Sequence, residues 1–195
     1  QQTTSELLRS FAIGNVIKNG VQVAIIGKPN AGKSTLLNTL LNENRAIVSA
    51  IAGTTRDTIE EILNIDGIIF RLIDTAGIRE HTTDEIESIG VGRSFEKADQ
   101  ADIVLYLYDQ STESKQALQE AVTWLQSLKK PFILVANKTD ITFNNINGTP
   151  VNNSIISISA KEGKGIEPLK KQLVREALAG EVNNESTIVT NARHF

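Results

Sequence analysis

The sequence predicts an α/β fold with a mainly parallel central sheet, one antiparallel hairpin at its edge and helices on both faces. Two observations predict it. Apolar runs alternate with helical stretches along the chain, an order typical of parallel strands covered by helices. In addition, Asp66-Gly67 separates two short strand-like runs, and this dipeptide is a strong signal for a two-residue hairpin turn.

Each expected element has a local pattern. The run VQVAIIG after residue 20 is continuously apolar, as in a strand buried on both faces. Thr3 and Glu6 form a capping box that begins an amphipathic helix. The expected strands cover residues 21–27, 59–65, 68–73, 101–109, 131–138 and 154–159. The expected helices cover residues 3–20, 33–41, 84–98, 114–128 and 165–179.

Composition restricts the function. The chain has 195 residues, of which 40% are hydrophobic and 22% charged, as in a soluble globular domain. Its formal net charge of −3 gives no electrostatic footprint for nucleic acid. Without cysteine, disulfides and thiolate sites are excluded. The longest apolar run, 103–108, is too short to span a bilayer. We therefore expect a cytoplasmic protein with no membrane partner, and the absence of methionine suggests a piece of a longer chain.

A phosphate-binding motif follows the first expected strand. GKPNAGKS (27–34) matches G-x-x-x-x-G-K-[ST] between a strand and a helix, which predicts the P-loop NTPase fold. Lys33 is expected to bridge the β- and γ-phosphates, and the Ser34 hydroxyl to bind Mg²⁺. The backbone amides beside the helix N-terminus point inward. The expected phosphate-binding residues are Asn30, Ala31, Gly32, Lys33, Ser34 and Thr35.

Two later motifs indicate guanine. Asp140, at the end of NKTD, can accept hydrogen bonds from guanine N1–H and the exocyclic amine, whereas adenine offers neither donor. Two such bonds correspond to roughly 10²–10⁴-fold discrimination. Ala160 in SAK is expected to donate its amide to guanine O6, while Asn137 and the Lys138 stem hold the base and the loops. The expected base-binding residues are Asn137, Lys138, Thr139, Asp140, Ser159, Ala160 and Lys161.

Two further segments look like the switches of a GTPase. In DTAG, Asp74 is expected to bind Mg²⁺ through water, and the Gly77 amide to sense the γ-phosphate. In GTTRD, Thr55 is the expected second hydroxyl on Mg²⁺. Ile78 occupies the place where many such switches carry a Gln that orients water. The expected switch contacts with the nucleotide are Ser49, Ala50, Ile51, Ala52, Gly53, Thr54, Thr55, Asp74, Thr75, Ala76 and Gly77.

These motifs resemble the translation-factor-related GTPases of the TrmE-Era-EngA-like class, whose second switch carries a hydrophobic residue instead of Gln. The quoted stretches are GKPNAGKSTLLN, AIVSAIAGTTRD, DTAGIRE, NKTD and SAK. Within the class, DEIES-IG and VTNARH (189–194) are similar to the MnmE (TrmE) family of tRNA wobble-uridine modification GTPases. The resemblance covers essentially the whole chain. It implies a G domain over 21–179, with 1–20 and 180–195 belonging to a surrounding helical domain.

The resemblance implies a potassium ion where other GTPases use an arginine finger, admitted when two G domains dimerise across their switches. The implied ligands are the Asn30 side chain and oxygens of Ser49, Ile51 and Thr54. Potassium is a hard cation that oxygen ligands suit. The alternative for Asn30 is an ordinary turn residue, since asparagines are common in loops.

The resemblance also implies a glutamate that orients water, beside the catalytic contacts of Thr55 and Gly77. Alignment of DEIESIG places it at Glu87. The segment after DTAG is one residue longer here, at Thr82-Thr83, than in the family pattern, so Glu85 is the alternative. Arg56 and Arg79 are candidates for the dimer interface or a switch, or for surface salt bridges.

The resemblance implies a GTPase cofactor and partner set: GTP or GDP, Mg²⁺ and K⁺, a homodimer with a transient G-domain dimer, the FAD-dependent MnmG (GidA) protein, and tRNA through that complex. A folate derivative belongs to the family's N-terminal domain, which this sequence lacks. Two alternatives stay open. One is a nucleotide-dependent binding switch with negligible hydrolysis, in which Ile78 is a true loss. The other is a ribosome-assembly GTPase of the Era or Der type.

Overall fold

The computed structural model describes residues 14, 20–44, 61–73, 96–141 and 155–191, with side chains of the last range described to residue 180. The strands are β1 (Val21–Ile26), β2 (Glu61–Ile65), β3 (Ile68–Leu72), β4 (Ile103–Asp109), β5 (Phe132–Asn137) and β6 (Ile156–Ser157). The helices are α2 (Lys33–Asn44), α5 (Lys115–Ser127) and α6 (Ile166–Asn191). A short helical segment covers 96–100.

The described strands form one sheet in the order β2-β3-β1-β4-β5-β6. All neighbours are parallel except β2 and β3, which are antiparallel. The turn between β2 and β3 has positive φ at Asp66 (52°) and Gly67 (84°), as a two-residue hairpin turn of matching twist requires. The Asn64 Oδ1 atom accepts the Gly67 N–H at 3.0 Å. The predicted fold class is confirmed, and the hairpin lies at the predicted edge.

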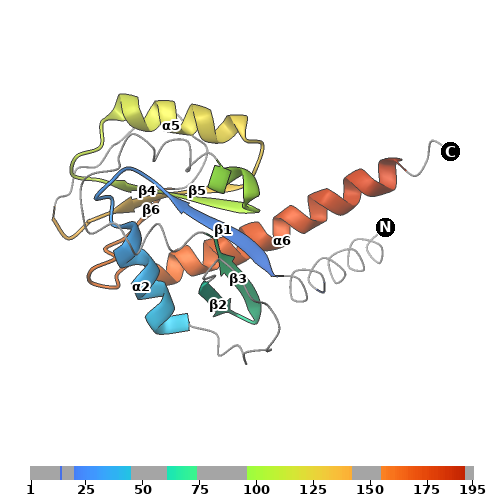
Figure 1. Cartoon of the computed structure of the whole chain (residues 1–195), viewed down its shortest axis with the longest axis horizontal. Helices are drawn as coiled ribbons and strands as arrows, with labels where there is room; N and C mark the ends of the chain where they lie inside the picture. Colours follow the sequence, from blue (N-terminus) through green and yellow to red (C-terminus); the bar gives the residue numbers. More distant parts are fainter. Residues whose placement is uncertain (1–13, 15–19, 45–60, 74–95, 142–154, 192–195) are drawn as a thin grey trace.

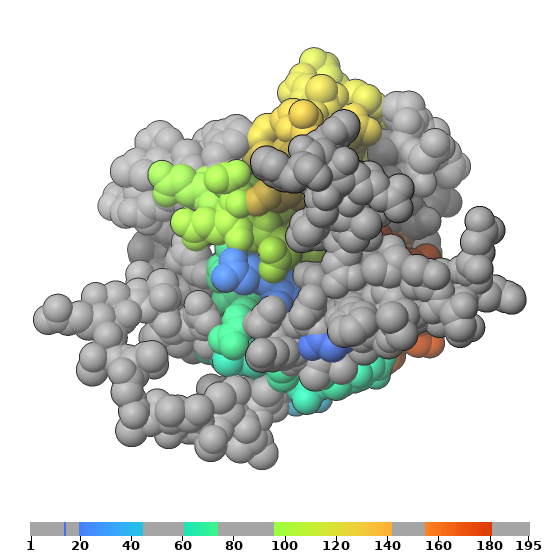
Figure 2. Space-filling model, turned by 90° about the vertical axis from the view of Figure 1, so that its right-hand side faces the viewer, coloured from blue at the N-terminus to red at the C-terminus, as the bar shows by residue number. Residues whose placement is uncertain are grey.

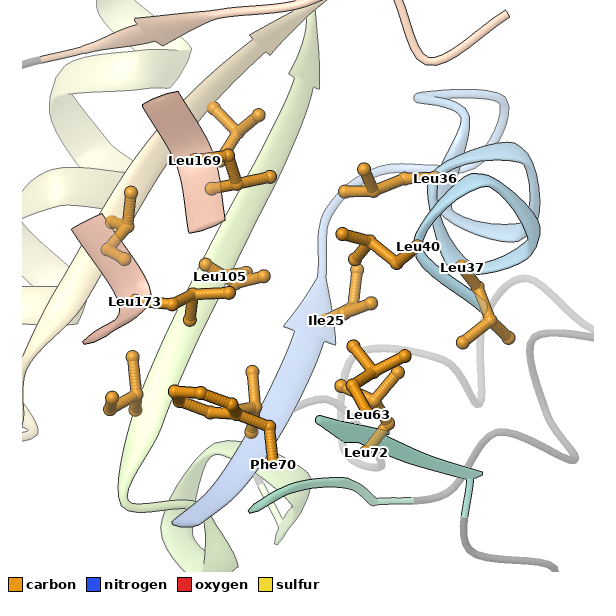
Figure 3. Close-up of a cluster of buried hydrophobic side chains, with 14 of the residues drawn as sticks. Ile25, Leu36, Leu37, Leu40, Leu63, Phe70, Leu72, Leu105, Leu169 and Leu173 are labelled. Carbon is orange, nitrogen blue, oxygen red and sulfur yellow. The ribbon is translucent and has the colours of Figure 1, made fainter. Parts of the chain in front are cut away.

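The sheet is covered on both faces. Figure 1 shows α5 above the strands and α2 with the first part of α6 below them, and Figure 2 again has α5 at the top and the β2–β3 hairpin near the bottom. On the lower face, leucines of α2 and α6 pack against the strands (Figure 3), including Leu36, Leu40, Leu169 and Leu173 with Ile25 and Leu105. On the upper face, Leu118, Val122 and Leu125 of α5 pack against β4 and β5.

Strand β4 contributes to both cores, which explains its continuous apolar run. Leu105 and Leu107 belong to the lower core, while Val104, Tyr106 and Tyr108 belong to the upper one. Side chains alternate between the two faces along a strand, so a strand covered on both faces must be apolar at every position. This arrangement carries the end of β4 to the same edge as the ends of β1 and β5.

The predicted helix over 114–128 is confirmed by α5. The Ser114 side chain accepts the Ala117 N–H at 3.1 Å and caps the helix, as a Ser at this position is expected to do. The predicted helix over 33–41 is also confirmed, since α2 covers it and continues to Asn44.

Two predicted boundaries were wrong. Strand β6 has only two residues, because Ser159 leaves the strand to form an isolated bridge with Lys164. The last helix does not end near residue 179 but continues to Asn191. A glycine that ends a helix usually has a left-handed backbone with positive φ. Gly180 does not have a positive φ, so the helix continues through it.

Some predicted elements lie outside the described residues. Of the expected helix over 3–20, only Gly14 is described, and it is helical. Of the expected helix over 84–98, only the end is described, as part of the helical segment 96–100. None of the helices described in the structure is both long enough and apolar enough to cross a membrane.

Candidate nucleotide site

The phosphate loop connects β1 to α2 at the carboxyl edge of the sheet. It passes so close to its neighbours that two glycines are required. A Cβ on Gly27 would lie 2.0 Å from the Leu107 carbonyl oxygen, and one on Gly32 would lie 2.2 Å from Asn137 Nδ2. Gly32 has φ 97° and Asn30 has φ 59°, both in the left-handed region that Gly and Asn tolerate best. The loop therefore takes its shape from these residue types.

Lys33 lies in the first turn of α2, with its side chain folded over the loop. Its Nζ donates to the carbonyl oxygens of Gly27 at 2.9 Å and Lys28 at 2.8 Å. The ammonium is thereby held at the mouth of the loop, beside the N-terminus of α2. Both the cation and the helix terminus favour an anion at this place. Ser34 follows on the same turn with an exposed side chain.

Asn137 joins the phosphate loop to the loop after β6. Its Nδ2 donates to the Ala31 carbonyl at 2.8 Å, and its Oδ1 accepts the Ala160 N–H at 3.0 Å. The residue is only 3% exposed, so both bonds are shielded from water and lie in a setting where an unpaired group is costly. The Ala160 amide, which the sequence assigns to guanine O6, donates to Asn137 in this structure.

Asp140 is oriented by Ser159. The Ser159 hydroxyl donates to Asp140 Oδ1 at 2.7 Å and accepts the Glu162 N–H at 3.3 Å. The Ser159 bond is the main cause that holds the pKa of Asp140 below its ordinary value, helped by the backbone and by Lys161. The carboxylate is therefore charged at neutral pH, and Asp140 Oδ2 takes no part in the Ser159 bond. An oriented carboxylate of this kind can accept the two donors on the guanine edge.

Lys138 is held by an acidic residue that the sequence did not predict. Its Nζ lies 2.7 Å from Asp109 Oδ2, at the end of β4. Asp109 Oδ1 in turn accepts the Ser111 N–H at 2.9 Å and the Ser111 hydroxyl at 2.6 Å. Burial raises the pKa of Asp109, but the bonds from Lys138 and Ser111 outweigh burial and lower it overall.

Two further contacts around the loops were missed. Lys28 Nζ lies 2.6 Å from Glu113 Oε1, whose side chain is only 3% exposed. The charge of Glu113 also acts on two nearby tyrosines: burial, followed by that charge, raises the pKa values of Tyr106 and Tyr108 to about 12. In the second contact, Thr39 of α2 donates its hydroxyl to the Ala160 carbonyl at 2.8 Å. No spacing in the sequence pointed to these residues, because their partners lie 85 and 121 positions away.

The structure brings together the predicted residues of the phosphate and base loops. The predicted switch and catalytic residues lie outside the described part of the chain. These are Ser49, Ala50, Ile51, Ala52, Gly53, Thr54, Thr55, Arg56, Asp74, Thr75, Ala76, Gly77, Ile78, Arg79, Glu85 and Glu87.

The cation sites can be tested only through Ser34 and Asn30. Both side chains are exposed at the mouth of the phosphate loop, and both offer oxygen atoms, the ligand type that Mg²⁺ and other hard cations prefer. The residues present therefore fit both ions. Within the described residues, no three His, Cys, Asp or Glu side chains form a metal-binding group.

A strand, a phosphate loop and a helix, with an Asn-Lys-x-Asp loop and a Ser-Ala-Lys loop at the same edge, define a P-loop GTPase. Comparison with known proteins gives the family. The chain belongs to the 50S ribosome-binding GTPases, whose family model matches residues 22–138.

Full-length relatives refine the resemblance. The tRNA modification GTPase MnmE of Cytophaga hutchinsonii is 52% identical over 202 residues, covering 100% of this chain and 42% of the relative. MnmE of Flavobacterium johnsoniae is also 52% identical, covering 97% and 42%, and that of Bacteroides thetaiotaomicron is 49% identical, covering 100% and 44%. The expected resemblance to the MnmE family is confirmed. The chain spans less than half the length of these relatives.

Solved structures agree on the fold. Era of Aquifex aeolicus, bound to GDP·AlF₄⁻, has a TM-score of 0.58 and 31% identity, covering 80% of this chain and 56% of Era. The G domain of the T. maritima FeoB iron transporter has a TM-score of 0.56 and 27% identity, covering 82% and 99%. The P-loop GTPase fold and the GTPase class expected from the sequence are thus confirmed.

Proposed function

We propose that this chain binds GTP and hydrolyses it in a potassium-dependent reaction, as the G domain of an enzyme that modifies the wobble uridine of tRNA (cmnm5U-type modification). One observation carries the proposal: relatives 44–52% identical across 97–100% of the chain are named tRNA modification GTPase MnmE. The geometry of the base loop supports the guanine part, because Ser159 orients the Asp140 carboxylate.

In the proposed site, the chain's own residues bind and orient the nucleotide. Lys33 and the amides of the phosphate loop bind the phosphates, and Asp140 reads the edge of the base. Ser34, Thr55 and Asp74 hold Mg²⁺, the last of them through water. When bound there, Mg²⁺ would supply positive charge to the phosphate oxygens.

Hydrolysis requires further contacts in the proposal. Gly77 donates its amide to the γ-phosphate, and Glu87, or Glu85 in its place, orients the attacking water. Asn30 with oxygens of Ser49, Ile51 and Thr54 holds K⁺, which supplies the positive charge that an arginine finger supplies elsewhere. The exposed Asn30 side chain beside the loop mouth supports this assignment.

The proposal extends to the protein around this domain. Residues 21–179 form the G domain, and 1–20 and 180–195 belong to a helical domain. Helix α6 begins in the G domain and continues into the helical domain. The protein works in the cytoplasm as a homodimer whose G domains dimerise transiently. Its partners are the FAD-dependent MnmG protein and, through that complex, tRNA, and a folate derivative binds to the rest of the protein.

The test is GTP turnover in potassium and in sodium at equal ionic strength and high protein concentration. An arginine finger contributes about 10³–10⁵ in rate, so even partial replacement by K⁺ should make turnover at least about tenfold faster in potassium. Asn30→Gly, which removes the side-chain amide but tolerates the left-handed backbone of this position, should remove the difference while leaving GDP affinity within about threefold. Equal rates in the two salts would overturn the potassium mechanism.

Two other functions have an observation in their favour. Ile78 in place of Gln favours a binding switch with negligible hydrolysis, and single-turnover assays in potassium distinguish it, because such a switch would release no phosphate. The family description and the 31% identity to Era favour a ribosome-assembly GTPase. Cosedimentation with ribosomal subunits, compared with rescue of tRNA modification in cells lacking the enzyme, separates that function from the proposed one.

A further inference from the structure

Asp109 and Lys138 form an ion pair that strand register creates. The two residues come from neighbouring strands, since Asp109 pairs with Asn137, the residue before Lys138. The Gln110 N–H also donates to the Asn137 carbonyl at 3.1 Å, which continues the pairing past the strand ends. The Lys138 and Asp109 side chains are 29% and 13% exposed. The pairing of β4 with β5 therefore places the Asp109 carboxylate beside the Lys138 ammonium.

Each oxygen of the Asp109 carboxylate has an assigned donor. Oδ2 accepts from Lys138 at 2.7 Å, and Oδ1 accepts both the N–H and the hydroxyl of Ser111. A carboxylate bonded on both oxygens has one orientation. The charge-assisted bond to Lys138 is also of the stronger kind. The Lys138 ammonium is thus held at one place at the carboxyl edge of β4.

The backbone of Lys138 is fixed as well. Its φ is 65°, a left-handed conformation that is unusual for lysine. The residue before it, Asn137, is bonded on both sides through Ala31 and Ala160. With its backbone and its ammonium both held, Lys138 has only the methylene stem available as apolar surface at the base loop.

We propose that Asp109 is a positioning residue for guanine-nucleotide binding, which holds the Lys138 ammonium so that the lysine stem presents a preformed apolar surface to the face of the base. This rests on the proposed GTP-binding function. A lysine without that partner would lose its rotamer freedom on binding, which weakens affinity. Asp140 reads the edge of the base, so Asp109 affects affinity and not the choice between bases that share a face.

The test is Asp109→Asn, which keeps the shape of the side chain and removes its charge. Dissociation constants for GDP and for IDP are measured by calorimetry in the presence of Mg²⁺. Both should rise by about tenfold, the factor that corresponds to ordering an otherwise free lysine side chain on binding, and their ratio should stay constant. In Lys138→Met, which keeps an apolar stem without the charge, adding Asp109→Asn should change the GDP dissociation constant by less than twofold.

Asp102→Asn is the matched control. Asp102 directly precedes β4, at the opposite end from Asp109, and its Oδ2 accepts the Gln22 N–H at 2.8 Å. The chemical change is the same, and the GDP dissociation constant should stay within twofold of wild type. If Asp109 had a merely structural role, Asp109→Asn would lower the melting temperature and leave the GDP dissociation constant unchanged, which would overturn the inference.

Several outcomes would overturn the inference. One is an Asp109→Asn variant that binds GDP as tightly as the wild-type protein does. Another is a double variant in which the separate effects of Asp109→Asn and Lys138→Met on the GDP dissociation constant multiply, since the two residues would then act independently. If Asp109→Asn does not fold, Ser111→Ala should weaken GDP binding about threefold, and unchanged affinity in that variant overturns the inference as well. A wild-type protein that binds no guanine nucleotide overturns the proposed function, and this inference with it.

Discussion

At the scale of single residues, Asn137 makes the contact between the phosphate loop and the base loops. It is a buried amide whose donor and acceptor both bind backbone groups, of Ala31 and of Ala160. Backbone groups at such places have no water to replace a lost partner. The same side chain also explains why position 32 must be glycine, since a Cβ there would collide with the amide. The Asn137 side chain therefore helps to fix the positions of the two loops relative to each other.

Asn137→Ala should lower the free energy of unfolding without nucleotide by about 2–3 kcal/mol, because two shielded hydrogen bonds are lost and two backbone groups are left unpaired. Urea denaturation followed by circular dichroism measures it. Asn64→Ala is the control, since Asn64 is also an asparagine bonded to backbone but is exposed, and it should lose less than about 1 kcal/mol. Equal losses in the two variants would show that the burial of Asn137 is unimportant.

Asp140→Asn should shift base preference from guanine toward xanthine. The amide can donate to the carbonyl that xanthine carries at C2, whereas it offers guanine one acceptor fewer. Each hydrogen bond corresponds to about a tenfold change in affinity, so competition between GDP and XDP should reverse. Because the pKa of Asp140 lies below its ordinary value of 3.8, the wild-type preference should stay constant above about pH 5. An unchanged preference in the variant would mean that Asp140 does not read the base.

At the scale of elements, α6 is fastened to the end of α2 through Lys170. Its Nζ lies 3.3 Å from Glu43 Oε2 and also contacts Asn44 and Glu167. Hydrogen bonding to Glu167 is the main cause that raises the pKa of Lys170. The two glutamates are 42% and 67% exposed, so water can replace the lysine around them. The buried stem of Lys170, in a residue only 9% exposed, is then the larger contribution.

Lys170→Ala should therefore lower the free energy of unfolding by about 1–2 kcal/mol through lost packing, while Lys170→Met should stay within about 0.5 kcal/mol of wild type. Chemical denaturation of both variants measures the difference. Lys171→Ala is the control, because Lys171 is exposed on the same helix and should have almost no effect. A methionine variant as unstable as the alanine variant would show that the ion pairs, and not the stem, stabilise this contact.

The elements themselves could mostly be predicted from the sequence. Strands β1 and β4 are apolar at nearly every position because each contributes to both cores, and Asp66-Gly67 has the backbone freedom that its turn needs. The two boundary errors have local causes that the hydrophobic pattern does not contain. Strand β6 is shortened by a bridge between Ser159 and Lys164, five residues farther along the chain. Helix α6 continues past residue 179 because Gly180 keeps a helical backbone.

At the scale of the whole molecule, the site forms because β1, β4 and β5 are parallel and end at one edge, where α/β sheets bind ligands. The motif residues Asn137, Asp140 and Ser159 could be placed there from the sequence, because each follows a recognisable strand. Their partners could not. Asp109 is 29 positions from Lys138, and Thr39 is 121 from Ala160. Polar residues after a strand or on a helix have no spacing that names their partner, so only the folded chain shows which ones meet.

The proposed domain boundary can be tested by truncating α6, whose 26 residues run across it. Its side chains in the lower core are Ile166, Leu169, Leu173 and Ala177. A chain that ends after residue 180 keeps all four. It should unfold within about 1 kcal/mol of the full chain and bind GDP within twofold.

A chain that ends after residue 172 loses Leu173 and Ala177, which are 1% and 5% exposed. Removing a buried leucine alone costs about 2–5 kcal/mol, so this chain should be strongly destabilised or fail to fold. Urea denaturation and GDP titration of both truncations provide the comparison. If the chain ending at 180 were destabilised as much as the shorter one, residues 181–195 would have to pack on the G domain, and the proposed boundary at 179 would be wrong.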